Sequence, residues 1–242
     1  MEPQGRTALV TGAGRRVGRA VALALAARGM RVAVHYHASE AEAADTVRQA
    51  EALGTEARSL RADLRQPESA EQLVRDVVAQ FGTLDVLINS AAIMLRTPLD
   101  EVTVEEWDET FSLNLRAPFF CARAAARVMR ERGGVIVNIA DLAGLETWPA
   151  YIPHGISKAG VIHMTRSLAR ALAPSVRVNA VAPGAVLLPE SWSAADAERL
   201  AGTTPLRRLG SPEDVAQAVS YLVDADYVTG ETLIVDGGRH LR

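Results

Sequence analysis

The chain has 242 residues, 48% of them hydrophobic and 23% charged, and its formal net charge at pH 7 is -3. This composition is that of an ordinary globular protein, and the charge excludes the basic surface that nucleic acid or an anionic membrane would require. Cys121 is the only cysteine, which excludes an intrachain disulfide and a cysteine-ligated metal site. The apolar stretches are too short to span a bilayer, and the N-terminus lacks the apolar core of a signal peptide. We therefore expect a cytoplasmic protein with no bound metal.

A strand, a glycine loop and a helix are predicted at the N-terminus. Residues 7–10 are apolar and β-like, residues 11–18 read Thr-Gly-Ala-Gly-Arg-Arg-Val-Gly, and the Ala- and Leu-rich residues 19–28 form a helix that stops at Gly29. This arrangement directs backbone N–H groups and a helix N-terminus towards phosphate. The glycine spacing differs by one residue from G-x-G-x-x-G, so a turn without a ligand stays open as the alternative on this motif alone.

The residues after a second strand, at 31–36, bear on the choice of cofactor. Dinucleotide folds that use NAD carry an acidic residue about twenty positions after the glycine loop. This chain has His37 and Ser39 there, with no carboxylate before Glu40, and it has Arg16 within the glycine loop. A guanidinium beside a hydroxyl and an imidazole suits a 2′-phosphate, so the sequence favours NADPH. The alternative is that Arg16 is a solvated surface residue.

Strands and helices alternate along the rest of the chain. Strands are predicted at 57–60, 84–88, 135–137, 176–181 and 232–235, and helices at 40–53, 67–81, 104–132 with an interruption near Pro118, 155–173 and 212–223. This alternation predicts one α/β domain over residues 1–242, a Rossmann-like, doubly wound parallel sheet of about seven strands with helices on both faces. The polar segment 190–205 resembles a lid, and we place a substrate lid at residues 186–205.

The stretch from residue 138 to residue 158 gathers three groups that can handle protons. His154 and Lys158 are four residues apart, so a helix through them places both side chains on one face. Asp141 follows a predicted strand end, where the loops of an open α/β sheet meet their ligands. Each residue also has an ordinary structural interpretation, as a solvated lysine, a capping or partly buried histidine and a turn-forming aspartate.

Several landmarks in order give the chain a resemblance to the short-chain dehydrogenase/reductase family. The pattern Thr11-Gly12-x-x-x-Arg16-x-Gly18 resembles the T-G-x-x-x-G-x-G cofactor loop of that family, with Arg16 at the middle glycine. Asn114, Asp141, His154 and Lys158 fall at the positions of its Asn-Ser-Tyr-Lys tetrad. The remaining landmarks are the Asn89-Ser90-Ala91-Ala92 turn, which resembles N-N-A-G, and the segments Pro183-Gly184 and Val235-Asp236-Gly237-Gly238.

The resemblance implies an enzyme in which a nicotinamide cofactor supplies hydride and the protein supplies orientation and protons. It implies catalytic roles for Asn114, Asp141, His154 and Lys158, with Lys158 also binding the nicotinamide ribose. It also implies cofactor binding by Gly12, Gly14, Arg15, Arg16, Val17, Gly18, His37, Ser39, Asp63, Leu64, Asn89, Ser90, Ala91, Lys158, Pro183, Gly184 and Val186. The resemblance also implies a homodimer or homotetramer, because the subunits of that family usually contact one another through the helices that here contain Cys121 and Met164.

A subfamily is indicated by the arginine in the glycine loop, by H-Y-H-x-S after the second strand and by Asp141. These features resemble pteridine reductases, which implies NADPH-dependent reduction of a flat, conjugated or heteroaromatic substrate held by Met94, Asp141, Tyr151, His154 and Leu188. Three positions depart from that pattern. His154 stands where the family has its catalytic tyrosine, Met94 stands where the subfamily has an aromatic residue, and Leu188 stands where many members have a hydroxyl-bearing residue. Two alternatives stay open: a carbonyl reductase that uses Tyr151 or water as its proton donor, and a cofactor-binding protein without turnover.

Overall fold

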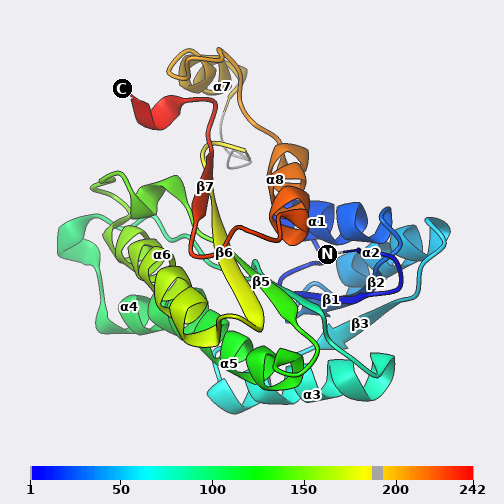
Figure 1. Cartoon of the computed structure of the whole chain (residues 1–242). Coiled ribbons are helices and arrows are strands. Elements are labelled where there is room, and N and C mark those ends of the chain that lie inside the picture. Colours follow the sequence, from blue (N-terminus) through cyan, green and yellow to red (C-terminus); the bar gives the residue numbers. More distant parts are fainter. Residues whose placement is uncertain (1, 187–192, 242) are drawn as a thin grey trace.

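The computed structural model describes residues 2–186 and 193–241. Within them, seven strands form one parallel sheet in the order β3-β2-β1-β4-β5-β6-β7, as Figure 1 shows. Their bounds are β1 Thr7–Val10, β2 Arg31–Tyr36, β3 Ala57–Arg61, β4 Val86–Asn89, β5 Gly134–Ile139, β6 Val176–Pro183 and β7 Thr232–Val235. The order reverses between β1 and β4, and such a switch point is where open α/β sheets bind ligands. The predicted fold class is confirmed.

The alternation of side chains along each strand divides the core into two layers. Ala8 and Val10 of β1 pack on one face with α1 (Arg16–Ala26), α2 (Glu40–Ala52) and α8 (Pro212–Asp224). Leu9 packs on the opposite face with α3 (Pro67–Phe81) and α5 (Ala117–Met129). Because both faces are covered, the central strands β1, β4 and β5 are buried along their whole length, as in other doubly wound sheets. Figure 1 shows the two helical layers on opposite sides of the sheet.

The long helical region before β5 contains the interruption that was predicted near Pro118. It is a π-helical turn, η2, at Ser112–Arg116 between α4 (Val104–Phe111) and α5. Pro118 lies just after this turn, and because proline has no N–H group it cannot donate to the carbonyl of Asn114, four residues before it. The break therefore comes from the widened turn that contains Asn114, and π-helical turns of this kind are often found at functional sites.

Other boundaries shift by a few residues. Helix α6 runs over Ile152–Leu172 and begins before the predicted residue 155, because Pro153 is tolerated in its first turn. The polar segment 190–205 contains a helix, α7 (Ala194–Ala201), which starts at a capping box formed by Ser193 and Asp196. Short 3-10 turns lie at η1 Leu99–Glu101, η3 Leu142–Gly144 and η4 Arg239–Leu241.

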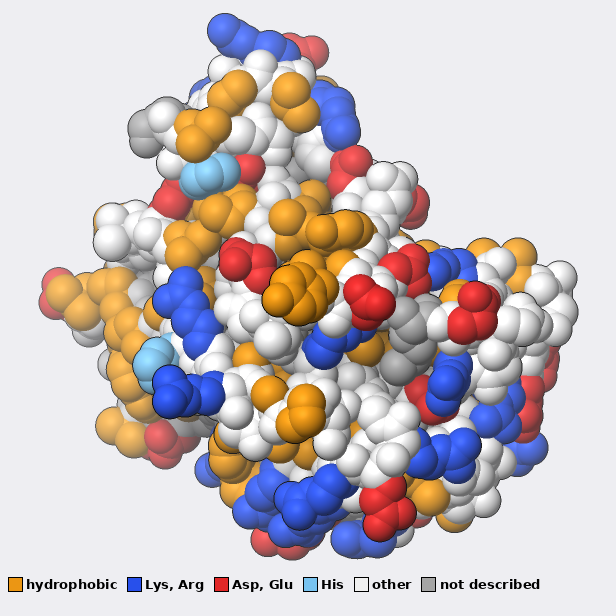
Figure 2. All heavy atoms as spheres, viewed as in Figure 1, with side chains coloured by type: hydrophobic (Ala, Val, Ile, Leu, Met, Phe, Trp, Pro, Cys, Tyr) orange, Lys and Arg blue, Asp and Glu red, His pale blue; other side chains and the backbone are white. Residues whose placement is uncertain are grey.

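The surface of the protein carries charges of both signs. Figure 2 shows acidic and basic side chains mixed over the face in view, as the small net charge predicts. In the described ranges, no helix combines the length and apolar character needed to cross a membrane. The same residues contain no group of three or more His, Cys, Asp or Glu side chains arranged to hold a metal ion.

Candidate active site

The loops after β1 and β4 are hydrogen-bonded to each other and closely packed at the switch point. Thr11 Oγ1 accepts hydrogen bonds from the backbone N–H groups of Ser90 and Ala91, at 2.9 and 3.1 Å. Gly12 has a φ of 66°, and a Cβ added to it would lie 2.9 Å from Ala91 Cα. Any larger residue at position 12 would push the two loops apart. The glycine loop and the Ser90–Ala91 segment therefore form one rigid edge.

The start of α1 fits the pyrophosphate of a dinucleotide. A Cβ on Gly18 would lie 2.2 Å from the backbone oxygen of Gly12, so this position requires glycine, and a Cβ on Gly14 would displace Ser39 Oγ, which lies 2.7 Å from it. The N-cap residue Arg15 makes no side-chain capping bond, and the first turn of α1 has no acidic residue. N–H groups at such a helix start favour an anion. The predicted residues Gly12, Gly14, Gly18 and Ser39 are thus brought together around this edge.

Arg16 occupies an unusual backbone conformation. Its φ is 56°, in the left-handed region, and its side chain is exposed. A residue with a Cβ in this region loses about 1 kcal/mol relative to glycine. The backbone thus explains why the family pattern has glycine here, and the exposed guanidinium remains available to a ligand. Arg15 is exposed as well, whereas Val17 is half-buried against the core.

The ends of β2 and β3 form a basic rather than an acidic surface. His37 Nε2 lies 3.8 Å from Asp63 Oδ2, and the Asp63 carboxylate accepts three hydrogen bonds from Arg65. The hydrogen bonds from the Arg65 guanidinium lower the pKa of Asp63, so this carboxylate is ionised but already paired. Leu64 is buried beside it. Residues 35–39 contain no carboxylate that would repel a 2′-phosphate.

Asn89 contributes to the sheet as well as to the switch point. Its Nδ2 donates to Asn138 Oδ1 at 2.9 Å, and Asn138 donates in turn to Thr165 Oγ1. The buried Asn89 Oδ1 has no partner among the described residues, so it can accept a hydrogen bond from a ligand. On the other side, the N–H of Gly184, beside Pro183, donates to Val235 O, and Val186 packs against the core.

His154 lies at the centre of the predicted tetrad. It is 4% exposed, its Nδ1 lies 3.1 Å from Ile93 O, and its Nε2 lies 3.7 Å from Asp141 Oδ2 without a hydrogen-bond partner. Asp141 Oδ1 accepts from Ala143 N at 2.8 Å, which fixes the carboxylate at the start of η3. The buried imidazole nitrogen and the half-buried carboxylate oxygen therefore face each other across a gap.

Asn114 determines which imidazole nitrogen carries a proton. Its Oδ1 accepts from Ile93 N, and its Nδ2 donates to Ile93 O at 2.9 Å and to Ser157 Oγ at 3.2 Å. Both N–H bonds of the amide are used, so the 3.4 Å approach to His154 Nδ1 is not a hydrogen bond from Asn114. His154 Nδ1–H therefore donates to Ile93 O, and Nε2 is the ring nitrogen left without a hydrogen-bond partner.

Lys158 is the only lysine of the chain, and it is almost completely buried. Its Nζ donates to Ile139 O at 2.8 Å. Burial lowers the pKa of Lys158 to about 8, and the nearby Asp141 carboxylate opposes part of that change. The group keeps most of its positive charge at neutral pH, one helical turn from His154. The structure thus brings Asn114, Asp141, His154 and Lys158 together as predicted from the sequence.

The predicted substrate residues have different surroundings. Met94 is 46% exposed, and Tyr151 is half-buried at the start of α6 with its ring 6.1 Å from Trp148, edge to face. Leu188 and part of the predicted lid lie outside the described residues. Sequence reasoning missed Ile93 and Ser157, because Ile93 acts through its backbone and Ser157 through a side chain on the buried side of α6.

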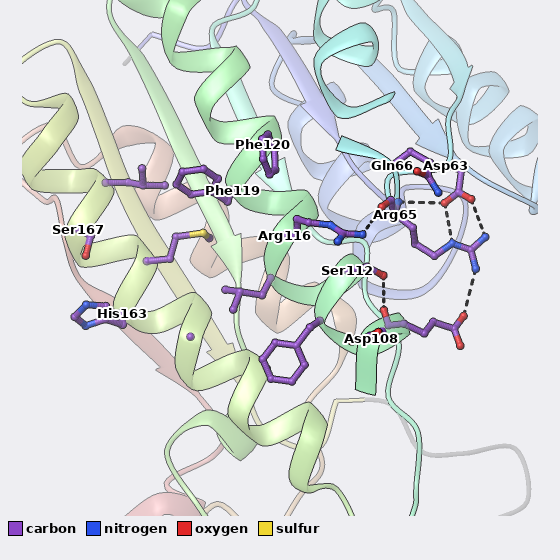
Figure 3. Close-up of a pocket in the computed structure, with 16 residues that line it drawn as sticks. Asp63, Arg65, Gln66, Asp108, Ser112, Arg116, Phe119, Phe120, His163 and Ser167 are labelled. Carbon is purple, nitrogen blue, oxygen red and sulfur yellow. Dashed lines mark hydrogen bonds and ion pairs between the residues drawn. The ribbon is translucent and has the colours of Figure 1, made fainter. Parts of the chain in front are cut away.

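A groove of about 1280 Å³ lies elsewhere, along α4, α5 and α6. It runs from His163 and Ser167 on α6, past Phe119 on α5, to Asp63 and Arg65, as Figure 3 shows. Neither Asp141 nor His154 lines it, so its volume gives no information about the tetrad. Its place on α5 and α6 matches the surface where sequence resemblance implies subunit contacts.

A parallel doubly wound sheet with a glycine loop at its switch point defines a dinucleotide-binding protein, and comparisons with known proteins refine this class. Residues 12–240 match the family model described as enoyl-(acyl carrier protein) reductase. The chain is 36% identical over 242 residues to 3-oxoacyl-[acyl-carrier-protein] reductase FabG of Staphylococcus aureus, with 98% of each chain covered. It is 38% identical over 247 residues to 3beta-hydroxysteroid dehydrogenase 1 of Eggerthella lenta, covering 98% of this chain and 95% of the relative.

Solved structures with a similar fold point to the same class of protein. A blue fluorescent protein from a metagenomic library, in complex with NADPH, has a TM-score of 0.92 and 35% identity, with 99% of each chain covered. Acetoin dehydrogenase YohF from Salmonella typhimurium has a TM-score of 0.90 and 32% identity, covering 98% of this chain and 96% of that one. The chain belongs to the short-chain dehydrogenase/reductase family. It is an NAD(P)-dependent oxidoreductase.

Proposed function

We propose that the chain is an NADPH-dependent reductase in which Asp141 and His154 together hold the proton that the substrate receives. The observation that carries this proposal is the buried, unpartnered His154 Nε2, 3.7 Å from Asp141 Oδ2. A neutral imidazole with its proton on Nδ1 would direct the Nε2 lone pair at a carboxylate. A proton shared between these two atoms removes that repulsion and is available for transfer.

The cofactor residues support NADPH in particular. Arg16, His37 and Ser39 would surround the 2′-phosphate, and the glycine loop with the start of α1 would hold the pyrophosphate. Bound NADPH would supply hydride to the carbon of a polarised double bond. The solved relative in complex with NADPH is consistent with this choice. Lys158 would orient the nicotinamide ribose, and its charge also stabilises the Asp141 carboxylate after the proton has left.

A flat heteroaromatic substrate with a C=N bond, as in a pterin, is the first candidate. The proton held between Asp141 and His154 would pass to the ring nitrogen of the C=N bond, and the Asp141 carboxylate would then accept a hydrogen bond from the N–H group that this transfer forms. Asp141→Ser, which restores the hydroxyl of the family pattern, should therefore weaken reduction of C=N and improve reduction of C=O. Asp141→Asn serves as the matched variant, because it removes the charge and leaves the shape.

A carbonyl reductase is the second candidate, and the relatives favour it, since they are named as reductases or dehydrogenases of oxoacyl, hydroxysteroid and acetoin compounds. NADPH consumption against dihydropterins, quinones, ketones and 3-oxoacyl thioesters separates the two candidates. Turnover of only the ketones and thioesters would replace the first candidate by the second. Binding of NADPH without turnover of any compound would mean that the chain is a cofactor-binding protein.

The proposal also includes contacts between subunits and a lid over the substrate. The groove along α5 and α6 exposes Phe119 and half-buries Leu115 and Leu168, and we propose that a second copy of the chain covers it in a homodimer or homotetramer. Residues 186–205 remain our proposed lid over the substrate. Both statements extend the function above, and neither is needed for the Asp141–His154 pair to act as the proton donor.

A further inference from the structure

His35 is a buried histidine at the end of β2 to which the sequence analysis gave no role. It is 2% exposed, yet both of its ring nitrogens have partners. Gly12 N donates to His35 Nδ1 at 3.1 Å, and His35 Nε2 lies 3.1 Å from Ala62 O. Because a backbone N–H can only donate and a carbonyl can only accept, the imidazole has a single possible tautomer, with its proton on Nε2.

This one ring joins two loops that approach the cofactor edge from opposite sides of β2. Gly12 belongs to the glycine loop after β1, and Ala62 immediately precedes Asp63 after β3. Backbone bonds follow the same route, since Ala13 N donates to His35 O at 2.9 Å and Ala62 N donates to Tyr36 O at 3.0 Å. The side chain of His35 thus adds a connection between the glycine loop and the Asp63 loop to the one that these backbone bonds make.

The neutral form of the ring is the one that fits. Protonation would place a second N–H on Nδ1, pointing at the N–H of Gly12. Burial lowers the pKa of His35 to about 4, with a smaller contribution in the opposite direction from the hydrogen bond to Ala62. The imidazole therefore keeps its two hydrogen bonds throughout the physiological pH range.

We propose that His35 is a positioning residue for the dinucleotide, because it fixes the distance between the glycine loop and the Asp63 loop before the cofactor arrives. A dinucleotide spans both loops, so a pre-set distance removes an ordering cost that binding would otherwise carry. The residue does not touch the reacting atoms, and its effect is confined to cofactor affinity. The competing explanation is that His35 only fills the core.

Three substitutions separate these explanations. In His35→Asn, the Oδ1 atom takes the place of Nδ1 and can accept from Gly12. In His35→Gln, the amide nitrogen takes the place of Nε2 and reaches Ala62 but leaves Gly12 N without its acceptor. His35→Leu fills the space and makes neither bond. Dissociation constants for NADPH and NADH are measured by fluorescence titration, next to melting temperatures and kcat at saturating cofactor.

We expect His35→Asn, His35→Gln and His35→Leu each to weaken the binding of both cofactors about tenfold, because each variant loses at least one of the two hydrogen bonds that join the loops. The kcat at saturation should change less than about twofold in all three. Wild-type cofactor affinity in any of the three variants would overturn the proposal. If the variants do not fold, hydrogen exchange in the cofactor-free wild type decides: slow exchange of the Gly12 amide supports the proposal, and exchange at the rate of an unprotected amide refutes it.

Discussion

The imidazole Nδ1 of His154 lies 3.1 Å from the carbonyl oxygen of Ile93, and this contact decides the chemistry of the opposite ring nitrogen. Asn114 clamps both the N–H and the C=O of Ile93, so the acceptor cannot move away. With Nδ1–H committed to Ile93, only Nε2 can give or take a proton, and it faces Asp141. This contact therefore orients the imidazole ring that we propose as a proton donor, as a second hydrogen bond orients the ring of other histidines.

Removal of this donor should slow turnover without loss of cofactor. His154→Ala is expected to lower kcat by roughly 10²–10⁴-fold, the usual contribution of a general acid, and to leave the dissociation constant for NADPH nearly unchanged. Lys158→Ala should damage both quantities, because the proposed ribose contact belongs to Lys158. His154→Tyr restores the family donor and should give partial activity. Tyr151→Phe is the control, and loss of activity there with near-native turnover in His154→Ala would transfer the donor role to Tyr151.

Arg16 should set the cofactor preference. NADPH should bind more tightly than NADH, and Arg16→Ala should narrow the difference by about 1–3 kcal/mol, the value of a hydrogen bond to a charged group. Arg16→Gly removes the same guanidinium but also relieves the left-handed backbone, where φ is 56°. It should therefore match Arg16→Ala in cofactor preference and exceed it in melting temperature. Equal affinity of the wild type for the two cofactors in titrations would contradict this assignment.

The single lysine allows a direct measurement of its titration. Selective labelling of lysine gives one side-chain signal in a magnetic resonance spectrum, because Lys158 is the only lysine in the chain. The midpoint of its titration should fall near pH 8, since burial lowers the pKa to about 8. In Asp141→Asn the midpoint should fall further, because the carboxylate favours the charged ammonium. A wild-type midpoint above pH 10 would show that Lys158 is solvated.

The same pKa makes a prediction about stability. Unfolded lysine keeps its proton up to about pH 10.4 and folded Lys158 up to about pH 8, so the unfolded state binds more protons between these values. Below pH 8, burial of the charged ammonium therefore lowers the free energy of unfolding by its full amount, about 3 kcal/mol. This loss of stability becomes smaller as the pH rises towards about 10.4. Lys158→Met should unfold at higher denaturant concentration than the wild type at pH 7, and this advantage should shrink between pH 8 and pH 10.

The groove along α5 and α6 should be a subunit contact. Phe119→Asp places a charge in this groove, where Phe119 is 38% exposed in the single chain. We expect light scattering to show a dimer or tetramer for the wild type and a species near 25.9 kDa for Phe119→Asp at micromolar concentration. Leu53→Asp, at the end of α2 and far from the groove in sequence, is the control and should leave the assembly intact. A wild-type species of only 25.9 kDa would end the proposal.

The sequence by itself determined the sheet, because most of its strands are short apolar runs separated by helices and glycine stops, and such an alternation admits few parallel arrangements. It also placed Asp141, His154 and Lys158 together, since one strand end and one helical turn carry all three. It also indicated the interruption near Pro118, although not that the interruption is a π-helical turn.

Only the tertiary structure decided the tautomer of His154 and the role of His35. Both depend on backbone groups distant in sequence, Ile93 O for His154 and Gly12 N with Ala62 O for His35. Backbone donors and acceptors are the same in every residue except proline, so no sequence pattern identifies which of them will meet a given side chain. Their positions are fixed by the packing of the loops after β1, β3 and β4, and that packing exists only once the sheet has formed.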